Sequence, residues 1–163
     1  MGARVLVTSL LGMLRPATTA DLPTILRYER DYVRTIEPHA LRGWTESIDQ
    51  NLQLWIECLS TTVVLEVAGS EDADPAGLAM WLVEGEAATL VTIHVAPRHR
   101  RSGFGRLLLE AFETRAAAGG SRVLKLGVHR DNPARALYER AGYGVVGTDG
   151  DYVLFERRAG DGS

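Results

Sequence analysis

Four arginines and two glycines fall within nine residues, RHRRSGFGR at 98–106, in a chain whose net charge is −3. The segment follows a predicted strand and begins a predicted helix, and the first N–H groups of a helix are free to bind an anion. Gly103 and Gly105 have no Cβ atom, so the backbone can approach a phosphate group closely. The arginines that add charge-assisted contacts are Arg100, Arg101 and Arg106. The segment therefore predicts a polyphosphate site.

Familiar nucleotide-binding patterns do not explain this segment. The dinucleotide-binding pattern needs a third glycine that the segment lacks, and no GxxxxGK[ST] sequence occurs in the chain. On spacing alone, a solvated basic loop that only turns the chain stays open as an interpretation, since an isolated GxG is weak evidence.

The composition is that of one globular domain with an apolar core: 163 residues, of which 45% are hydrophobic and 24% charged. A negative net charge argues against a general nucleic-acid-binding protein, whose surface is usually basic. The single cysteine, Cys58, cannot form an internal disulfide, which suits the reducing cytoplasm, and we expect it to pack in the core. No residues have the spacing of metal ligands.

The N-terminal segment 5–14 is apolar, so a secretory signal must be weighed against a strand with a short leader. The segment is too short to span a bilayer, and no convincing small-residue cleavage site follows it, which favours the strand. The expected organisation is a leader at 1–12, one domain at 13–158 and a tail at 159–163, with Met13 as an alternative start.

Hydrophobic periodicity, capping residues and glycine stops divide the chain into short strands and helices. Two apolar, β-branched segments flank the acidic connection 69–77 and predict an antiparallel hairpin, and a later strand–helix–strand run predicts a βαβ crossover. The expected strands are 14–17, 61–68, 77–85, 88–95, 122–128, 143–147 and 151–158. The expected helices are 19–35, 45–59, 105–120 and 134–141. This order predicts an α/β fold.

Two longer stretches, VTIHVAPRHRRSGFGRLLLEAF and VLKLGVHRDNPARALYERAGY, resemble the core of the GNAT superfamily of acyl-CoA-dependent N-acyltransferases. The residues that match the family's phosphate loop are Arg100, Gly103 and Gly105. The residues that match its downstream pattern are Asn132, Leu137, Tyr138, Glu139, Ala141, Gly142 and Tyr143. The resemblance covers residues 14–157 and is densest at 93–143, whereas 31–60 match no family pattern.

The resemblance implies a twisted, mixed, mostly antiparallel sheet flanked by helices, with acetyl-CoA as cosubstrate between the fourth and fifth strands, which splay apart. The unpaired backbone that would bond the pantetheine arm lies at Ile93, His94 and Val95. The pyrophosphate would be held by the side chain of Arg100 and by the backbone amides of Arg101, Ser102, Gly103, Phe104, Gly105 and Arg106. Asn132 would touch the pantetheine region, although a simple helix cap explains this residue equally well.

Direct attack of an amine on the thioester forms a tetrahedral intermediate that expels a thiolate, so an acid near the sulfur should help. The resemblance assigns this role to Tyr138, whose phenol stays protonated at neutral pH. Tyr138 also lies on a helical stripe with Ala134, Leu137 and Ala141, which is typical of a core position.

A general base is harder to find, because the strand positions where relatives often carry an acid are occupied here by Thr89 or Thr92 and by Gly127. The remaining candidates are His94 and His129 on these strands, and Glu84 and Glu86 near the approach to the cleft. Relatives that acetylate protein N-termini carry the fifth-strand acid, so its absence favours a small amine as acceptor.

The first two helices shape the acceptor pocket in this family, and here they carry acids and aromatic rings that suit a cationic amine. These residues are Tyr28, Glu29, Asp31, Tyr32, Glu37, His39, Trp44 and Trp55. A solvated acidic face with ordinary core aromatics is the competing interpretation.

We therefore expect a cytoplasmic N-acetyltransferase that transfers the acetyl group of acetyl-CoA to a small primary amine. We expect neither nucleic acid nor a membrane as a partner, and a homodimer stays open. The alternatives are an enzyme that acetylates a protein or peptide amine and a non-catalytic acyl-CoA sensor. An open, flat acceptor surface would favour a protein substrate, whereas a pocket between the first helices and the sheet would favour a small amine.

Overall fold

The computed structural model describes residues 12–69 and 73–161, and within them a seven-stranded sheet runs in the order β1-β2-β3-β4-β5-β7-β6. The strands are β1 Met13–Pro16, β2 Thr62–Glu66, β3 Gly77–Glu84, β4 Ala87–Val95, β5 Val123–His129, β6 Gly144–Asp149 and β7 Tyr152–Arg158. The α-helices are α2 Leu22–Ile36, α3 Leu41–Glu46, α4 Ile48–Glu57, α5 Phe104–Ala118 and α6 Arg135–Arg140. Neighbouring strands are antiparallel except β4 and β5, which are parallel. The expected mixed, mostly antiparallel sheet is confirmed.

Parts of the expected leader, acidic connection and tail lie outside the described residues, namely 1–11, 70–72 and 162–163. Within the described part of the chain, no helix combines the length and the apolar character needed to cross a membrane.

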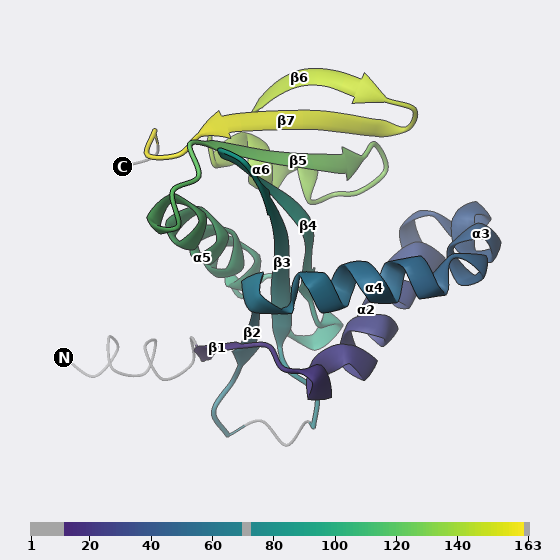
Figure 1. The fold of residues 1–163 in the computed structure, drawn as a ribbon. Coiled ribbons are helices and arrows are strands. Elements are labelled where there is room, and N and C mark those ends of the chain that lie inside the picture. The colour runs from purple at the N-terminus through teal and green to yellow at the C-terminus, as the bar shows by residue number, and fades with distance from the viewer. Residues whose placement is uncertain (1–11, 70–72, 162–163) are drawn as a thin grey trace.

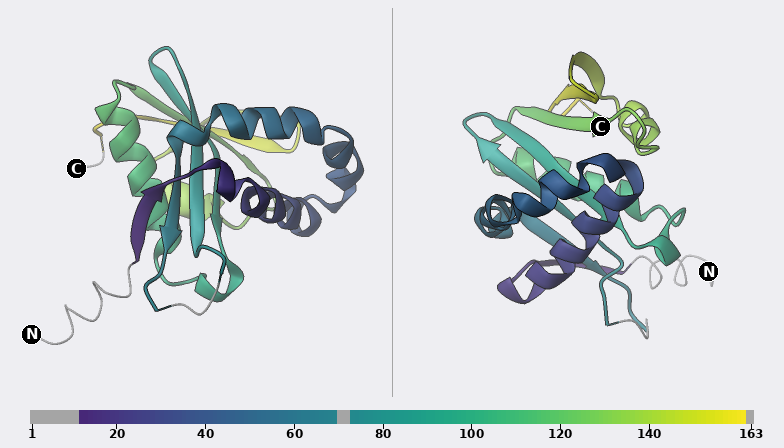
Figure 2. Two further views of the ribbon diagram at one scale, coloured as in Figure 1. Left: turned by 60° about the horizontal axis from the view of Figure 1, so that its bottom comes forward. Right: turned by 90° about the vertical axis from the view of Figure 1, so that its right-hand side faces the viewer.

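Helices cover both faces of the sheet (Figures 1 and 2). Side chains alternate along β3, so that Ala79 and Trp81 face α5 while Leu78 and Met80 face α2 and α4. Trp81 packs against Phe112 of α5, with ring centroids 5.5 Å apart. Because both of its faces are covered, β3 has a nearly continuous apolar sequence.

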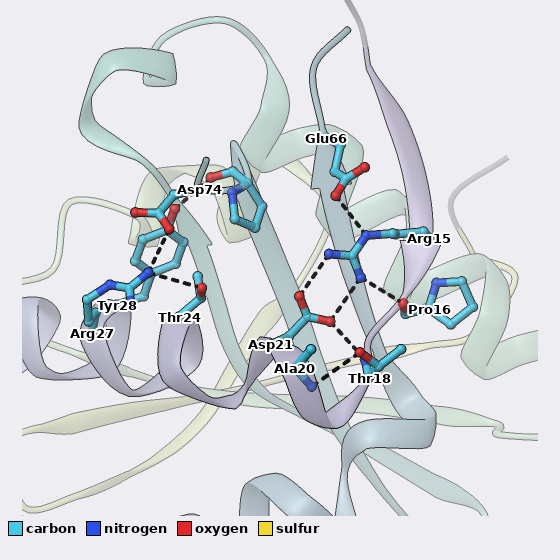
Figure 3. A network of polar contacts seen from close by, with 11 residues as sticks. Arg15, Pro16, Thr18, Ala20, Asp21, Thr24, Arg27, Tyr28, Glu66 and Asp74 are labelled. Atoms are coloured by element: carbon cyan, nitrogen blue, oxygen red, sulfur yellow. Dashed lines mark hydrogen bonds and ion pairs between the residues drawn. The ribbon is translucent and has the colours of Figure 1, made fainter. Parts of the chain in front are cut away.

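An ion-pair network fixes the start of α2 against the first two strands (Figure 3). Arg15 of β1 donates two hydrogen bonds to Asp21, at 2.8 and 2.9 Å, and one to Glu66 of β2 at 2.8 Å. Asp21 also accepts a hydrogen bond from the backbone N–H of Thr18, as part of a capping box. Hydrogen bonding to Arg15 lowers the pKa of the Asp21 carboxyl from its ordinary value, so this anchor is ionised at neutral pH.

A second set of contacts fixes how α2 is rotated about its axis (Figure 3). The Tyr28 hydroxyl donates a hydrogen bond to the backbone carbonyl of Pro75 at 2.6 Å, and Arg27 forms an ion pair with Asp74 at 2.6 Å. The Tyr28 ring also stacks on His94 of β4, with ring centroids 4.2 Å apart. These contacts set the direction in which the next residue of the helix, Glu29, projects.

The expected helix at 45–59 contains α4, but the shorter helix before it, α3, was not expected. Ser47 separates them with a non-helical backbone (φ −102°, ψ 19°). Serine is a weak helix former because its hydroxyl competes for backbone hydrogen bonds, which explains why the break falls at this residue. The bend brings Trp44 of α3 against Trp55 of α4, with ring centroids 6.3 Å apart.

Candidate active site

The strands β4 and β5 separate halfway along their length. Their parallel pairing ends at Leu90 and Leu126, after which β4 stays paired with β3 and β5 with β7. Val91, the next residue of β4, is the extra residue of a β-bulge, and bulges bend a strand away from its neighbour. Figure 1 shows β5 turning away from β4. The strands therefore splay where the sequence resemblance implied.

A cavity of about 580 Å³ lies between this opening and the helices α2, α3 and α4. From the strands it is lined by Thr92, Ile93 and Gly127, and from the helices by Glu29, Tyr32, Glu37, Trp44 and Trp55. Asn132, Tyr138 and Tyr152 also line it. Among the described residues that line it there is no lysine or arginine, and its ionisable side chains besides the tyrosines are Glu29, Glu37 and His39. The volume is typical of a site for a small molecule.

Glu29 brings a carboxyl group from α2 to the edge of β4. It is half-buried in the cavity wall, and the Thr92 hydroxyl donates a hydrogen bond to it. Burial raises the pKa of Glu29 to about 7, and the hydrogen bond from Thr92 opposes this shift. A carboxyl group with such a pKa exchanges protons readily at neutral pH. Sequence reasoning placed Glu29 in the acceptor pocket but did not identify it as a base.

Glu37 lies at the C-terminal cap of α2 and is 8% exposed. The Tyr152 hydroxyl of β7 donates a hydrogen bond to its carboxylate at 2.5 Å, and the Tyr32 hydroxyl donates a second. Burial and this neighbouring carboxylate raise the pKa of both tyrosines, so both phenols stay protonated and act as donors. The carboxylate and the two phenols form one polar group in the cavity wall.

Tyr138 is both a core residue and a residue of the cavity wall, the two alternatives that the sequence left open. It is 6% exposed and packs edge-on against Tyr143, with ring centroids 6.2 Å apart, so its ring belongs to the core. It also lines the cavity. Burial raises its pKa to about 12, which keeps the phenol protonated at neutral pH.

Asn132 is a helix cap and a cavity residue at once. Its side-chain oxygen accepts a hydrogen bond from the backbone N–H of Ala134 at 2.9 Å, at the start of α6. Its side chain also forms a hydrogen bond with the Tyr32 hydroxyl, and the residue lines the cavity. Asn132 thus connects the first turn of α6 to the acceptor side of the site.

The glycine-rich segment forms the N-terminus of α5. Gly103 is the N-cap in the left-handed region (φ 81°), and Arg101 before it has φ 62°. The first backbone hydrogen bond runs from the Leu107 N–H to the Gly103 carbonyl at 3.1 Å, so the amides of Phe104, Gly105 and Arg106 have no acceptor within the helix. A Cβ at Gly103 would meet no atom of the described residues within 4 Å. This open space above free amides is what a phosphate requires.

The side chains of this segment contact other parts of the protein, whereas its backbone amides at the start of α5 are free. Phe104 is 5% exposed and packs in the core, so it can offer only its amide. The Arg100 guanidinium donates a hydrogen bond to the Val95 carbonyl at 3.2 Å, and Arg106 pairs with Glu110 at 3.0 Å. Both arginines stay exposed, so a bound anion can recruit them.

Residues 25–143 match the family model described as the acetyltransferase (GNAT) family. The chain belongs to this family. Its fold and its enzymatic class, acetyl transfer, follow from that membership.

Three acetyltransferases show how similar this chain is to known proteins. The [ribosomal protein bS18]-alanine N-acetyltransferase of Haemophilus influenzae is 38% identical over 61 residues, which are 37% of this chain and 42% of that protein. The chain therefore aligns with less than half the length of this relative. The PaiA N-acetyltransferase of Thermoplasma acidophilum, solved with coenzyme A, is 19% identical at a TM-score of 0.73, over 90% of this chain and 98% of that one. Nourseothricin acetyltransferase is 28% identical at a TM-score of 0.52, over 60% of this chain and 64% of that one.

GNAT enzymes use acetyl-CoA as cosubstrate, and two features of this chain fit it. The N-terminus of α5 offers free amides below an open space, which suits a pyrophosphate. The separation of β4 from β5 leaves backbone groups near Ile93 without a partner on that side, which suits the amide-bearing pantetheine arm. Both features are those that a bound acetyl-CoA would need.

We predict that Gly103→Val weakens acetyl-CoA binding by about tenfold or more, because its side chain would occupy the phosphate's space and resist the left-handed backbone. Calorimetric titration measures the effect. Gly85→Val is the matched control, because Gly85 also has a left-handed backbone (φ 59°) with no atom near its Cβ position, but lies in the β3–β4 turn. Equal affinity in both folded variants would remove the phosphate role of Gly103.

Neither histidine suggested as a base lies in the cavity lining. The His94 ring stacks on Tyr28 outside the lining, and burial together with the charge of Arg100 lowers its pKa to about 4. His129 is 2% exposed, and its Nδ1 accepts a hydrogen bond from the Asp131 backbone N–H at 3.1 Å. Side chains alternate along β4, so His94 shares a face with Thr92 but lies two residues nearer the C-terminal end of the strand. His94 retains only its backbone near the opening.

The two glutamates suggested as bases lie at the wrong end of the hairpin. Glu84 is exposed and pairs with Ala87 where β3 turns into β4, at the end opposite the cavity. Glu86, in the same turn, forms an exposed ion pair with Arg122 at 3.6 Å. The sequence places both near the strands but does not reveal at which end the strands open. Glu29 replaces them as the candidate base.

Proposed function

We propose that this GNAT enzyme transfers the acetyl group of acetyl-CoA to the primary amine of a small molecule. The observation that carries the proposal is the cavity between α2–α4 and the β4–β5 opening, with the Glu29 carboxyl in its wall. A cavity in this position is what a small amine requires, whereas a peptide needs an open surface. The buried single cysteine, Cys58, is consistent with a cytoplasmic enzyme.

Glu29 acts as the general base. Bound acetyl-CoA supplies a thioester, so that a C–N bond to the amine forms, the C–S bond breaks, and coenzyme A leaves as a thiol. The incoming amine is an ammonium at neutral pH and must lose a proton before it can attack. Glu29 accepts this proton, and its pKa of about 7 is matched to the task. Thr92 orients the carboxylate through its hydrogen bond.

Tyr138 acts as the general acid. Its phenol is protonated at neutral pH and lines the cavity on the side of α6, across from Glu29 on α2. We assign to its O–H the proton that the departing sulfur takes up. The nitrogen that has attacked carries one proton more than the amide product, and its loss through solvent restores the proton of Tyr138. The proton bound by Glu29 returns to solvent, so both side chains are ready for the next turnover.

Acetylation of a protein amine is the second candidate, and the likeness to the bS18-alanine N-acetyltransferase supports it. The groups of this chain that could hold an amine lie inside the cavity, and Gly127 stands where the resemblance places the acid of enzymes acting on protein N-termini. These observations favour the small amine. A non-catalytic sensor needs no base, so a poised carboxyl in the site argues against that alternative as well.

Release of free coenzyme A from acetyl-CoA tests the proposal. The protein is incubated with acetyl-CoA and a panel of small primary amines, and separately with peptides that begin with alanine. The proposal predicts turnover with members of the amine panel and little with the peptides. Turnover with peptides alone would support the protein-directed alternative, and binding of acetyl-CoA without any turnover would support the sensor.

A further inference from the structure

The Glu37 carboxylate is buried without a counter-cation. It is 8% exposed, and among residues 12–69 and 73–161 no lysine, arginine or histidine forms an ion pair with it. Its hydrogen bonds come from two neutral phenols, Tyr152 and Tyr32. Buried carboxylates are rarely left without a positive partner, because removing the charge from water is unfavourable unless an opposite charge compensates it. The site therefore lacks one positive charge.

The surroundings of Glu37 suit a cation supplied by a ligand. Among the described residues, the lining of this cavity has no lysine or arginine, and His39 is its one basic side chain, so an acceptor with a carboxylate or phosphate would find no permanently charged cation there. Trp44 and Trp55 line the same cavity as Glu37, and indole faces attract alkylammonium groups. The charge of the cavity and its aromatic surface thus both favour an alkylammonium ligand.

Glu37 and Glu29 lie on one face of α2. They are two helical repeats of four residues apart, with Val33 between them, and all three line the cavity. At 1.5 Å of rise per residue, their backbones are about 12 Å apart along the helix axis. A ligand that places one nitrogen at Glu29 can therefore place a second positive group at Glu37.

We propose that Glu37, with Tyr32 and Tyr152, forms a second cation site, so that the acceptor is a diamine or another flexible primary amine with a second ammonium group. This inference rests on the proposed small-amine function and adds its substrate class. Glu29 receives the nitrogen that is acetylated, and Glu37 binds the nitrogen that is not.

Acetylation rates of three amines of one length test this inference on the wild-type protein. The amines are hexane-1,6-diamine, hexylamine and 6-aminohexanoate, which carry a positive, a neutral and a negative far end. We expect kcat/KM to be highest for the diamine, at least about tenfold lower for hexylamine, and lowest for 6-aminohexanoate. The variant Glu37→Gln should remove most of the preference for the diamine over hexylamine.

Glu46→Gln is the matched control, because Glu46 of α3 is exposed, pairs with Arg42 at 3.0 Å, and does not line the cavity. It should keep the wild-type preference. Equal rates for the diamine and hexylamine with the wild-type protein would overturn the second cation site while leaving the small-amine function standing. No turnover of any amine, with alanyl peptides acetylated instead, would contradict the proposed function itself. The wild-type comparison decides the matter even if Glu37→Gln does not fold.

Discussion

Glu29→Gln is expected to lower kcat for amine acetylation by about 100-fold, because general base catalysis contributes at least this much when the base is correctly placed. Glutamine keeps the size of the side chain and can still meet Thr92, but it cannot accept the proton of the ammonium. Steady-state release of coenzyme A measures the effect. Affinity for acetyl-CoA should stay the same, because the proposed cosubstrate contacts lie on other elements.

The pH profile shows whether Glu29 acts as a base. Burial places its pKa near 7, so the carboxylate is the major form above this pH and kcat/KM should rise as the pH increases through about 7. The inflection should vanish in Glu29→Gln. Thr92→Val should move the inflection to higher pH, because the hydrogen bond from Thr92 lowers the pKa of Glu29. The other ionisable side chains that line the cavity are Tyr32, Glu37, His39, Tyr138 and Tyr152.

Thermal unfolding provides the control for Glu29→Gln. Since the folded state raises the pKa of Glu29 above its unfolded value, ionisation of this group destabilises the folded protein, and the stability it contributes is lost as the pH rises through about 7. Glutamine should therefore leave Tm at pH 8 unchanged or slightly higher. A variant that is stable and retains full activity would remove Glu29 from the mechanism.

Tyr138→Phe is expected to lower kcat by about tenfold to 100-fold with little change in the affinity for acetyl-CoA. Phenylalanine keeps the edge-on contact with the Tyr143 ring, at a centroid distance of 6.2 Å, but removes the proton that we assign to the departing sulfur. Stopped-flow or steady-state measurement of coenzyme A release, beside calorimetric titration, separates the effect on turnover from the effect on binding.

Tyr143→Phe is the matched control for this prediction. The Tyr143 hydroxyl donates a hydrogen bond to Glu113 at 3.1 Å, and the residue is 4% exposed but does not line the cavity. Its replacement should cost stability, about 1 kcal/mol for the lost hydrogen bond, without changing kcat. If Tyr138→Phe behaves in the same way, Tyr138 is a packing residue and the acid lies elsewhere.

Local features of the sequence predicted where the glycine-rich segment lies in the fold. The phosphate segment is contiguous, and its glycines and arginines occur at the junction of a strand and a helix, so spacing alone placed it at the N-terminus of α5. The βαβ crossover followed from a strand, a helix and a strand in direct succession. The helix α3 and the break after it at Ser47 were missed, because no proline or glycine marks that break.

The acceptor side could not be predicted in the same way, because its contacts join residues far apart in the chain. Glu29 becomes a base only where it meets Thr92 of β4, and Glu37 becomes a buried carboxylate only where β7 brings Tyr152 to it. The helical spacing of Glu29, Val33 and Glu37 was the available signal. That spacing shows a shared face, but it does not show that the face lies against an opening in the sheet.

A direct competition between acceptors tests the central claim that this enzyme acetylates a small amine within the cavity. Wild-type protein is supplied with acetyl-CoA, hexane-1,6-diamine and a peptide that begins with alanine, both acceptors at the same concentration, and the acetylated products are quantified by mass spectrometry. The cavity and its carboxylates predict that the acetylated diamine dominates. Predominant acetylation of the peptide would contradict the claim and make the protein-directed activity the function of this chain.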